Sequence, residues 1–570
     1  GSLTVPDSDP RPAPATFLAH LAGSLHAVAD ILGREGLKPY GGGMQIDTSV
    51  LKGQVDAHLV INTLLGQYTK PSDTHVSAQA NVADFTVAKL IGKQAFERAN
   101  LAVTVDSDGL QASGEGRLVG APASIALNRP AGVSDTQAVI ATTLDDKARA
   151  KLGFGSSDVR GPIGAQITSI LGQSGPQTAQ VKLDLTHAAI ENLIPGYSKP
   201  AGRPAKTSFQ VTADSRGASV GQFVFQGGDA SAHGSLRFDS SGALQEAHLT
   251  QFRVSPGDDM RLDADQGKDA LNIVVRGANL DARPFLRALS TDEGGKNDGL
   301  TKNVDLNLRA ALVTGNNREA ISNFVLRLAK RGDDLRQFQL AGRFGRAAVA
   351  GVMVRTPPGM ASQINVTSAN AGRLLAFTDL YRRVQGGALS VTMALEKKSI
   401  AGRLTIHNFV VRNEPGLRRI VSEGVAKRTP EPTFINTSAA QFTKLQVDFT
   451  RIASRIYLRD GSMFGPQIGT TLAGWLDFAH NKVNLSGTFV PAYGLNNLFS
   501  QIPIFGLILG GGAHEGLFGV NFRISGAASA PVLTIDPLSA IAPGFLRKIF
   551  GAIDNMGNDD LAPPPAASFH

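Results

Sequence analysis

Apolar and polar residues alternate with a period of two along much of the chain beyond Met44. In the segment 304–310, the apolar residues Val304, Leu306 and Leu308 are separated by polar ones. Such alternation is typical of a β-strand with one apolar and one polar face. The same pattern recurs in Leu101–Val105, Phe209–Ala213, Leu389–Leu395, Leu445–Phe449 and Val520–Ile524.

Short turn sequences rich in Gly, Asp and Ser separate the alternating segments. They include Asp106–Gly109, Asp239–Gly242, Gly227-Gly228 and Gly386-Gly387. These residue types suit hairpin connections that need positive φ angles. The long crossover helices that a parallel sheet requires do not stand out in the pattern. The sequence therefore predicts a mainly β protein, built as an elongated, curled antiparallel β-sheet with short corner helices and terminal amphipathic helices.

The first 40 residues follow a different pattern. Residues 1–15 contain four prolines and predict a flexible lead-in. Between Ala15 and Leu37 apolar residues recur at helical spacing, which predicts an amphipathic helix that packs on a sheet edge. His20 and His26 in this segment are too far apart for the i, i+4 pair of a helical metal site.

A second regularity divides residues 41–493 into repeating units. Five segments begin with Asp, Asn or Pro at a strand end and continue into a Leu-rich stretch, and their starts lie roughly 100 residues apart. They are 84–92, 184–194, 279–289, 370–380 and 491–499. Each predicts a corner helix, and together they predict a degenerate repeat of strands and helices. A coincidence of strand ends would give a similar spacing.

Residues 494–555 predict an atypical terminal unit, followed by a disordered tail at 556–570. The run 498–512 is apolar but too short to cross a bilayer. In 537–553 the apolar residues would gather on one side of a helix. Two interpretations stay open: a buried plug that closes the sheet, or an element that touches a membrane or the groove end. The residues concerned are Leu498, Phe499, Ile504, Phe505, Leu507, Ile508, Leu538, Ile541, Phe545, Leu546, Arg547, Lys548, Ile549 and Phe550.

Composition narrows the classes of function. The formal net charge is +8, but Lys and Arg are scattered without interleaved aromatic residues, so we expect no nucleic-acid partner. The chain has no cysteine, which excludes disulfides and thiolate sites. Its 11 histidines are dispersed, and no phosphate loop, nucleophile elbow or carboxylate dyad stands out. We therefore expect no metal, no cofactor and no enzymatic activity.

Membrane-spanning and targeting signals are not evident in the pattern. No window of about 18 uninterrupted apolar residues occurs, and no signal peptide begins the chain. The opening Gly1-Ser2 is typical of a cloning remnant. The expectation is a soluble part of a longer protein, with any membrane anchor upstream.

Segments of the last third resemble the carboxy-terminal region of AsmA-like proteins, in particular the YhdP-like branch. They are Gly487–Phe499, Gly510–Gly512, Glu515–Gly519 and the stretch from Asn521 through Pro537 to Arg547. Over residues 40–480 the resemblance is confined to the pattern of strands and corner helices. It implies a periplasmic protein anchored to the inner membrane and built as a repeating β-groove, similar to TamB and to bridge-like lipid transfer proteins. It also implies a role in moving phospholipid between inner and outer membranes and in outer-membrane integrity.

These observations lead to one main expectation for function. Strands with one apolar face, joined edge to edge, would form a groove that shields the acyl chains of phospholipid or another acyl lipid. The expected lining residues are Val304, Leu306, Leu308, Leu389, Val391, Met393, Leu395, Val520, Phe522 and Ile524. The alternative is an envelope scaffold or assembly protein that binds protein partners through exposed strand edges and transports no lipid.

Overall fold

The computed structural model of the chain contains two compact units. Unit 1 comprises residues 1–256 and 261–266, and unit 2 comprises residues 257–260 and 267–570. The structure describes residues 1–7, 12–32, 51–66, 74–91, 94–133, 135–152, 155, 157–171, 177–194, 196–214, 216–290, 303–332, 334–354, 362–396, 399–425, 435–491 and 520–536. Strands predominate over helices in these residues, which confirms the predicted mainly β class.

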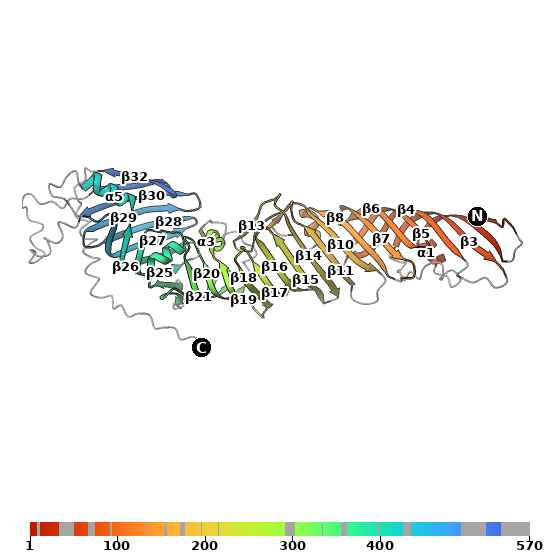
Figure 1. Cartoon of the computed structure of the whole chain (residues 1–570), viewed down its shortest axis with the longest axis horizontal. Helices are drawn as coiled ribbons and strands as arrows, with labels where there is room; N and C mark the ends of the chain where they lie inside the picture. Colours follow the sequence, from red (N-terminus) through yellow and green to blue (C-terminus); the bar gives the residue numbers. More distant parts are fainter. Residues whose placement is uncertain are drawn as a thin grey trace, which may run out of the picture. The chain divides into compact units, whose positions relative to one another are not determined.

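Unit 1 is a succession of antiparallel strands that lie side by side (Figure 1). Its described strands are β1 (Ser2–Thr4), β2 (Ala13–Ser24), β3 (Leu51–Leu65), β4 (His75–Ile91), β5 (Gln94–Asp106), β6 (Gly109–Leu118), β7 (Ala121–Pro130), β8 (Thr136–Leu144), β9 (Val159–Arg160), β10 (Ile163–Leu171), β11 (Gln177–Asp184), β12 (Ala189–Ile194), β13 (Tyr197–Lys199), β14 (Ala205–Asp214), β15 (Gly217–Gly227), β16 (Ala230–Asp239) and β17 (Leu244–Arg253). The helices are α1 (Leu25–Leu32) and α2 (Asp146–Lys151). Strands β9, β12 and β13 form a small separate sheet.

Unit 2 is also built mostly on consecutive antiparallel strands. Its described strands are β19 (Leu271–Asp281), β20 (Val304–Thr314), β21 (Ala320–Arg331), β22 (Asp334–Phe344), β23 (Ala347–Val354), β24 (Ser362–Ser368), β25 (Val384–Leu395), β26 (Ser399–Arg412), β27 (Ala439–Ile452), β28 (Arg455–Phe464), β29 (Ile468–Asp477), β30 (Lys482–Pro491), β31 (Val520–Ala527) and β32 (Ala530–Asp536), and β18 (Asp259–Gln266) has residues in both units. The helical segments are α3 (Arg283–Ser290), α4 (Ala371–Phe377), α5 (Pro415–Arg419) and the π-helical turn η5 (Ile420–Val425). All six strands predicted from alternation lie within β5, β14, β20, β25, β27 and β31.

The sheet topology is mixed, with one parallel step that the sequence did not predict. The described strands of unit 2 form a mixed sheet, because one of their pairings is parallel. Strand β19 pairs in parallel with β20, from Leu271 opposite Val304 to Asp281 opposite Thr314, and α3 follows β19 in the connection between them. A crossover through a helix is the usual way to join two parallel strands. This step departs from the antiparallel meander that the sequence predicts for most of the sheet.

Hairpin turns form at three of the four predicted sites. Asp106 pairs with Gly109 across the β5–β6 turn, and the Asp106 side chain accepts a hydrogen bond from the Asp108 N–H (2.9 Å). The β15–β16 and β16–β17 turns fall at Gly227-Gly228 and Asp239–Gly242. Gly386-Gly387 is not a turn: both residues lie inside β25, where their φ angles of 69° and 80° need glycine.

The predicted helix between Ala15 and Leu37 is wrong in its first part. Residues 13–24 form β2, which pairs with β3 along its whole length. Only Leu25–Leu32 is helical among the described residues of that segment, and β1 pairs with β2 in place of the expected flexible lead-in. Hydrogen bonding to a strand distant in sequence here outweighs the local helical spacing of apolar residues.

Two of the predicted corner helices are confirmed. Helix α3 overlaps 279–289 and ends one residue beyond it, and α4 falls within 370–380. The side chain of Asn370 accepts a hydrogen bond from the Arg373 N–H (3.1 Å) and so caps the start of α4. The structure adds α2 and α5, which the sequence did not predict; Asp145 and Glu414 cap them in the same way.

Two other predicted corner helices are wrong. Asp84 lies inside β4 with a φ of 51°, and the chain continues as a strand. Asp184 ends β11 and accepts a hydrogen bond from the Thr186 N–H (2.9 Å) in a tight turn that leads into β12. Aspartate stabilises such turns as readily as helix starts, so the residue type alone did not separate them. The fifth segment, 491–499, lies outside the described residues beyond Pro491.

No helix in the described part of the chain has both the length and the apolar character needed to cross a membrane. The terminal segments 494–519 and 537–570 also lie outside the described residues, so the expected terminal amphipathic helix is not described.

Candidate apolar binding face

One face of the unit 1 sheet carries an almost unbroken row of apolar residues. Side chains of residues directly opposite one another in paired strands lie on the same face, so the strand registers define the row. From β2 to β17 its members are Leu21, Ala57, Ala80, Val103, Ala112, Leu127, Ala138, Ser169, Ala179, Val211, Val220, Leu236 and Ala247. Ser169 is its one polar member.

A second row runs beside the first, two residues along each strand. Its members are Val55, Val82, Leu101, Gly114, Ile125, Ile140, Ile167, Val181 and Phe209. The two rows together make a band of apolar side chains on one face of the unit 1 sheet.

The opposite face of the same strands is polar. The row of residues that starts at His20 and His58 continues through Gln79, Thr104, Gln111, Asn128 and Gln137, all of them exposed. The side-chain period of two in a strand places these residues between those of the apolar rows. The unit 1 sheet is therefore amphipathic across its strands.

The described residues of the protein cover the apolar band of unit 1 only in part. Leu25 and Val28 of α1 pack against the cluster that contains Val55, Val82 and Leu101, and Ala148 of α2 belongs to a smaller cluster with Leu144. Further along the sheet Ile125, Ile140 and Val220 are buried, but six members of the band keep part of their surface exposed: Val103, Leu127, Ile167, Val181, Val211 and Leu236. This incomplete cover leaves apolar surface accessible from solvent.

Unit 2 repeats the arrangement with three rows on one face. From β19 to β27 the first comprises Val275, Leu308, Leu326, Leu340, Gly351, Val366, Val391, Leu404 and Val447. From β25 to β31 the second comprises Leu389, Ile406, Leu445, Met463, Thr470, Phe489 and Val520. From β24 to β32 the third comprises Ile364, Met393, Gly402, Phe449, Leu458, Gly474, Leu485, Ile524 and Leu533.

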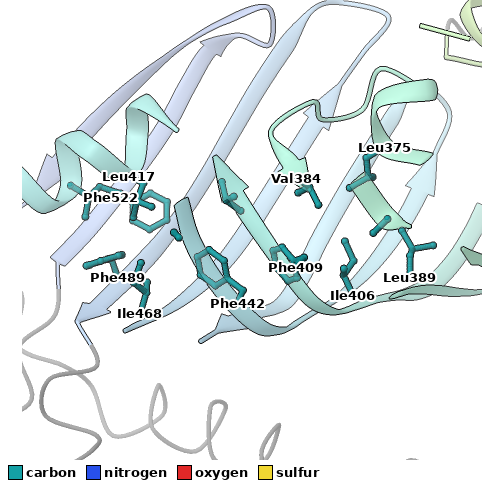
Figure 2. Close-up of a cluster of buried hydrophobic side chains, with 14 of the residues drawn as sticks. Leu375, Val384, Leu389, Ile406, Phe409, Leu417, Phe442, Ile468, Phe489 and Phe522 are labelled. Carbon is teal, nitrogen blue, oxygen red and sulfur yellow. The ribbon is translucent and has the colours of Figure 1, made fainter. Parts of the chain in front are cut away.

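Short helices seal one side of this face in unit 2. Helix α4 packs on β25 and β26, and η5 packs on β31 and β32. Leu375 of α4 and Leu417 of α5 join Ile406, Phe442 and other sheet residues in a buried hydrophobic cluster (Figure 2). The aromatic rings of Phe409 and Phe442 stack within it, with their centroids 5.3 Å apart. The Leu389 row is thus part of the protein's own core.

The ten predicted lining residues all lie on the apolar face of unit 2, but they differ in exposure. Val304, Leu389, Val520 and Phe522 are 9% exposed or less, because other side chains of the protein cover them. Leu306, Leu308, Val391, Met393, Leu395 and Ile524 are half-buried. The accessible part of the face therefore lies along parts of the Leu308 and Met393 rows, since other members of these rows, Val275, Val447, Ile364 and Leu485, are buried. The fourteen residues predicted to contact a membrane or the groove end, Leu498 through Phe550, lie outside the described residues.

Cross-strand ion pairs hold the polar face of unit 2. Arg403 lies directly opposite Asp448, with Nε 2.6 Å from Oδ1, and its hydrogen bond lowers the pKa of that carboxyl. Arg455 lies opposite Asp477 at 3.0 Å, and its guanidinium stacks on the ring of Trp475 at 5.0 Å. These charged residues face away from the apolar rows, so the two faces of the sheet have opposite chemical character.

Asp477 differs from Asp448 because its side chain is only 2% exposed. Burial acts to raise the pKa of Asp477, but hydrogen bonds from His480 and Arg455 outweigh burial and hold the pKa below its usual range. A carboxyl with a lowered folded-state pKa stabilises the protein at neutral pH. That contribution is lost as the pH falls below about 3.9, its pKa in the unfolded chain.

Asp477→Asn is expected to lower the free energy of unfolding of unit 2 by about 1.5–3 kcal/mol at pH 7, because charge-assisted hydrogen bonds are lost. The difference from the parent should shrink as the pH falls below about 4, because the carboxyl of the unfolded parent chain then takes up a proton while that of the folded chain is still ionised. Urea unfolding followed by the fluorescence of Trp475, the one tryptophan of the chain, measures both values. Asp448→Asn is the control: its pair is more exposed, so we expect a loss below about 1 kcal/mol. Equal losses for the two variants would contradict the conclusion that the buried carboxyl of Asp477 stabilises unit 2 more than the exposed carboxyl of Asp448 does.

Sequence reasoning missed one cluster of polar residues, which lies on the polar face of unit 1. His20, Asp56 and His58 come together where β2 pairs with β3. The expectation of dispersed histidines overlooked this cluster because it considered spacing along a helix, whereas these residues meet across two strands. The available signal was Asp56-Ala57-His58, in which two polar residues alternate on one side of a strand.

The chain was compared with known proteins by sequence and by structure. No family model, no curated protein and no solved structure matches it.

Proposed function

We propose that this chain binds the acyl chains of phospholipid, or of another acyl lipid, on its apolar face and carries them between the inner and outer membranes. The observation that supports this most directly is the continuity of the apolar rows across the paired strands of each unit, together with their incomplete cover. A protein core is normally closed by a second layer, and a long exposed apolar band is unusual without an apolar ligand.

In this proposal the apolar face takes the place of the membrane interior as the surroundings of the acyl chains, so the favourable free energy of binding is that of burying their methylene groups. Each buried methylene contributes about 0.8 kcal/mol, so about a dozen methylenes contribute about 10 kcal/mol before the cost of association. The immobilisation of the lipid costs about 4–15 kcal/mol, so net binding is modest and the lipid can leave again. The polar head group stays in water, as the polar face of the sheet does.

The cellular setting of the proposal rests on the sequence. The lack of cysteine and the resemblance to AsmA-like proteins support a periplasmic protein anchored to the inner membrane in its full length. We infer no catalytic step, because the proposed role needs only an apolar surface for the acyl chains and access to water for the head groups.

A second candidate function has one observation in its favour. Strand β1 pairs with β2 only at Thr16–Leu18, so much of β2 has a paired strand on one side only among the described residues. Leu18 and Leu21 on this strand are exposed. An open strand edge of this kind can accept a strand of another protein. The candidate is an envelope scaffold that binds protein partners.

Photo-crosslinking in cells tests the two functions against each other. A photoreactive amino acid at Leu127, on the apolar face of β7, is expected to form adducts with phospholipid. Its neighbour Asn128, exposed on the polar face of the same strand, is the matched control and should form none. Mass spectrometry of the purified adducts identifies the partner. Peptide adducts at Leu127 without lipid would favour the scaffold, and a chain that carries no lipid after native purification would contradict the transfer proposal.

A further inference from the structure

His20, Asp56 and His58 occupy neighbouring positions on two paired strands. In the β2–β3 register His20 lies directly opposite His58, and Asp56 precedes His58 by two residues on the same side of β3. The Nε2 atom of His20 lies 3.0 Å from Oδ1 of Asp56, and Nε2 of His58 lies 3.9 Å from the same oxygen. One carboxylate oxygen therefore lies within reach of both imidazole rings.

The two imidazole rings stack beside this oxygen. Their centroids are 4.8 Å apart and their planes differ by 20°. The three possible ligand atoms, one from each residue, all lie within 4.8 Å of one another. Bonds of about 2.0–2.2 Å to a tetrahedral ion place its ligand atoms about 3.4 Å apart. The two measured nitrogen–oxygen distances, 3.0 Å and 3.9 Å, fall on either side of that value, so the spacing of the three residues is close to that of three ligands around one ion.

The surroundings of the cluster suit a cation. Leu21 and Ala57, which neighbour the cluster along the strands, belong to the apolar row on the other face, so the three polar side chains point to solvent. The side chains of His20, Asp56 and His58 are 54%, 58% and 74% exposed, which leaves the ligand atoms open to an ion from solution. On the next strand, β4, the residues opposite Asp56 and His58 are the neutral amides Asn81 and Gln79.

We propose that His20, Asp56 and His58 form a binding site for a divalent transition-metal ion of the zinc class. Two imidazoles with one carboxylate are ligands that Zn²⁺, Co²⁺, Ni²⁺ and Cu²⁺ accept, whereas Mg²⁺ and Ca²⁺ prefer oxygen ligands alone. Three protein ligands leave a coordination position for water. The ion would join β2 to β3 near the open edge of the sheet, so its binding would stabilise the folded form of unit 1. The proposal is independent of lipid binding, because the site lies on the polar face.

Titration of the full chain, after removal of any affinity tag, tests the site. Isothermal titration calorimetry with Zn²⁺ is expected to show one ion per chain, and Co²⁺ should give visible absorption bands typical of a site with nitrogen and oxygen ligands. His20→Ala and His58→Ala should each weaken the affinity at least about tenfold, since even residues that only orient metal ligands contribute that much. Zn²⁺ should also raise the unfolding temperature of the parent but not of these variants.

Two other histidines provide matched controls. His75 is exposed on β4, and His248 is exposed and pairs with Asp263; both lie outside the cluster of His20, Asp56 and His58. His75→Ala and His248→Ala should leave both the stoichiometry and the affinity unchanged. Binding of much less than one ion per chain, or affinities of His20→Ala and His58→Ala equal to that of the parent, would overturn the proposal. Because all the substituted side chains are exposed, these results do not depend on a change in folding.

Discussion

Met393→Asp is expected to lower the amount of lipid that copurifies with the chain at least about tenfold. Met393 is half-buried on the apolar face of β25, in the row that continues through Phe449 and Ile524. A carboxylate at this point would have to lose water for an acyl chain to pass over it, at a cost of about 2–3 kcal/mol or more. In the lipid-free chain the same carboxylate can remain hydrated, because the position is partly exposed. Quantification of extracted lipid per mole of chain measures the effect.

Thr392→Asp is the matched control for this prediction. Thr392 is the preceding residue of the same strand and is exposed on the polar face, directly opposite Arg403. The same charge is thereby introduced into β25 without contact with the apolar face. Circular dichroism should show that both variants keep their strand content. If the two variants carry equal amounts of lipid, the apolar face of unit 2 is not the lipid-binding surface.

The alternation of residues was sufficient to predict the faces of the strands. In β20, β25 and β31 the residues predicted to share a face do so, because the side-chain period of a strand is two. The relation between these strands could not be predicted. Leu389 and Val520 belong to one row only through the registers of the five intervening strands. Two of these registers, β27–β28 and β28–β29, shift at irregularities that a single sequence does not reveal.

The exposure of the individual apolar residues could not be predicted from the sequence either. Val391 and Leu389 have the same pattern and neighbouring positions in β25, yet Leu389 is covered in the buried cluster and Val391 stays half-buried. The difference arises from α4 and α5, which pack over one side of the sheet. Helix α5 was not predicted, since its five residues carry too short a pattern to identify.

The errors near the amino terminus have a common physical cause. Residues 13–24 carry apolar residues at helical spacing, but full-length pairing of β2 with β3 satisfies the backbone hydrogen bonds. A single sequence does not reveal such a distant partner. The same pairing creates the contact between His20 and His58, so the missed strand and the missed candidate metal site are one error.

Phe442→Ala is expected to destabilise unit 2 by about 3–5 kcal/mol, because it leaves a cavity in a core that cannot close around it. Phe442 on β27 is 3% exposed, and its ring stacks on Phe409 of β26 beneath the helices. Urea unfolding followed by Trp475 fluorescence should show a lower midpoint with an unchanged slope. Ile452→Ala on the same strand is the control, because Ile452 is 51% exposed and should cost less than about 1 kcal/mol.

The same variant separates the core of unit 2 from its accessible face. Phe442 lies in the cluster that the protein's own helices cover, whereas Met393 lies in the half-buried row beside it. Under conditions where Phe442→Ala remains folded, the lipid carried per chain should therefore equal that of the parent, although stability has fallen. A loss of lipid equal to that of Met393→Asp would mean that acyl chains enter beneath α4 and α5. In that case the helices would act as part of the lipid-binding surface and not as its boundary.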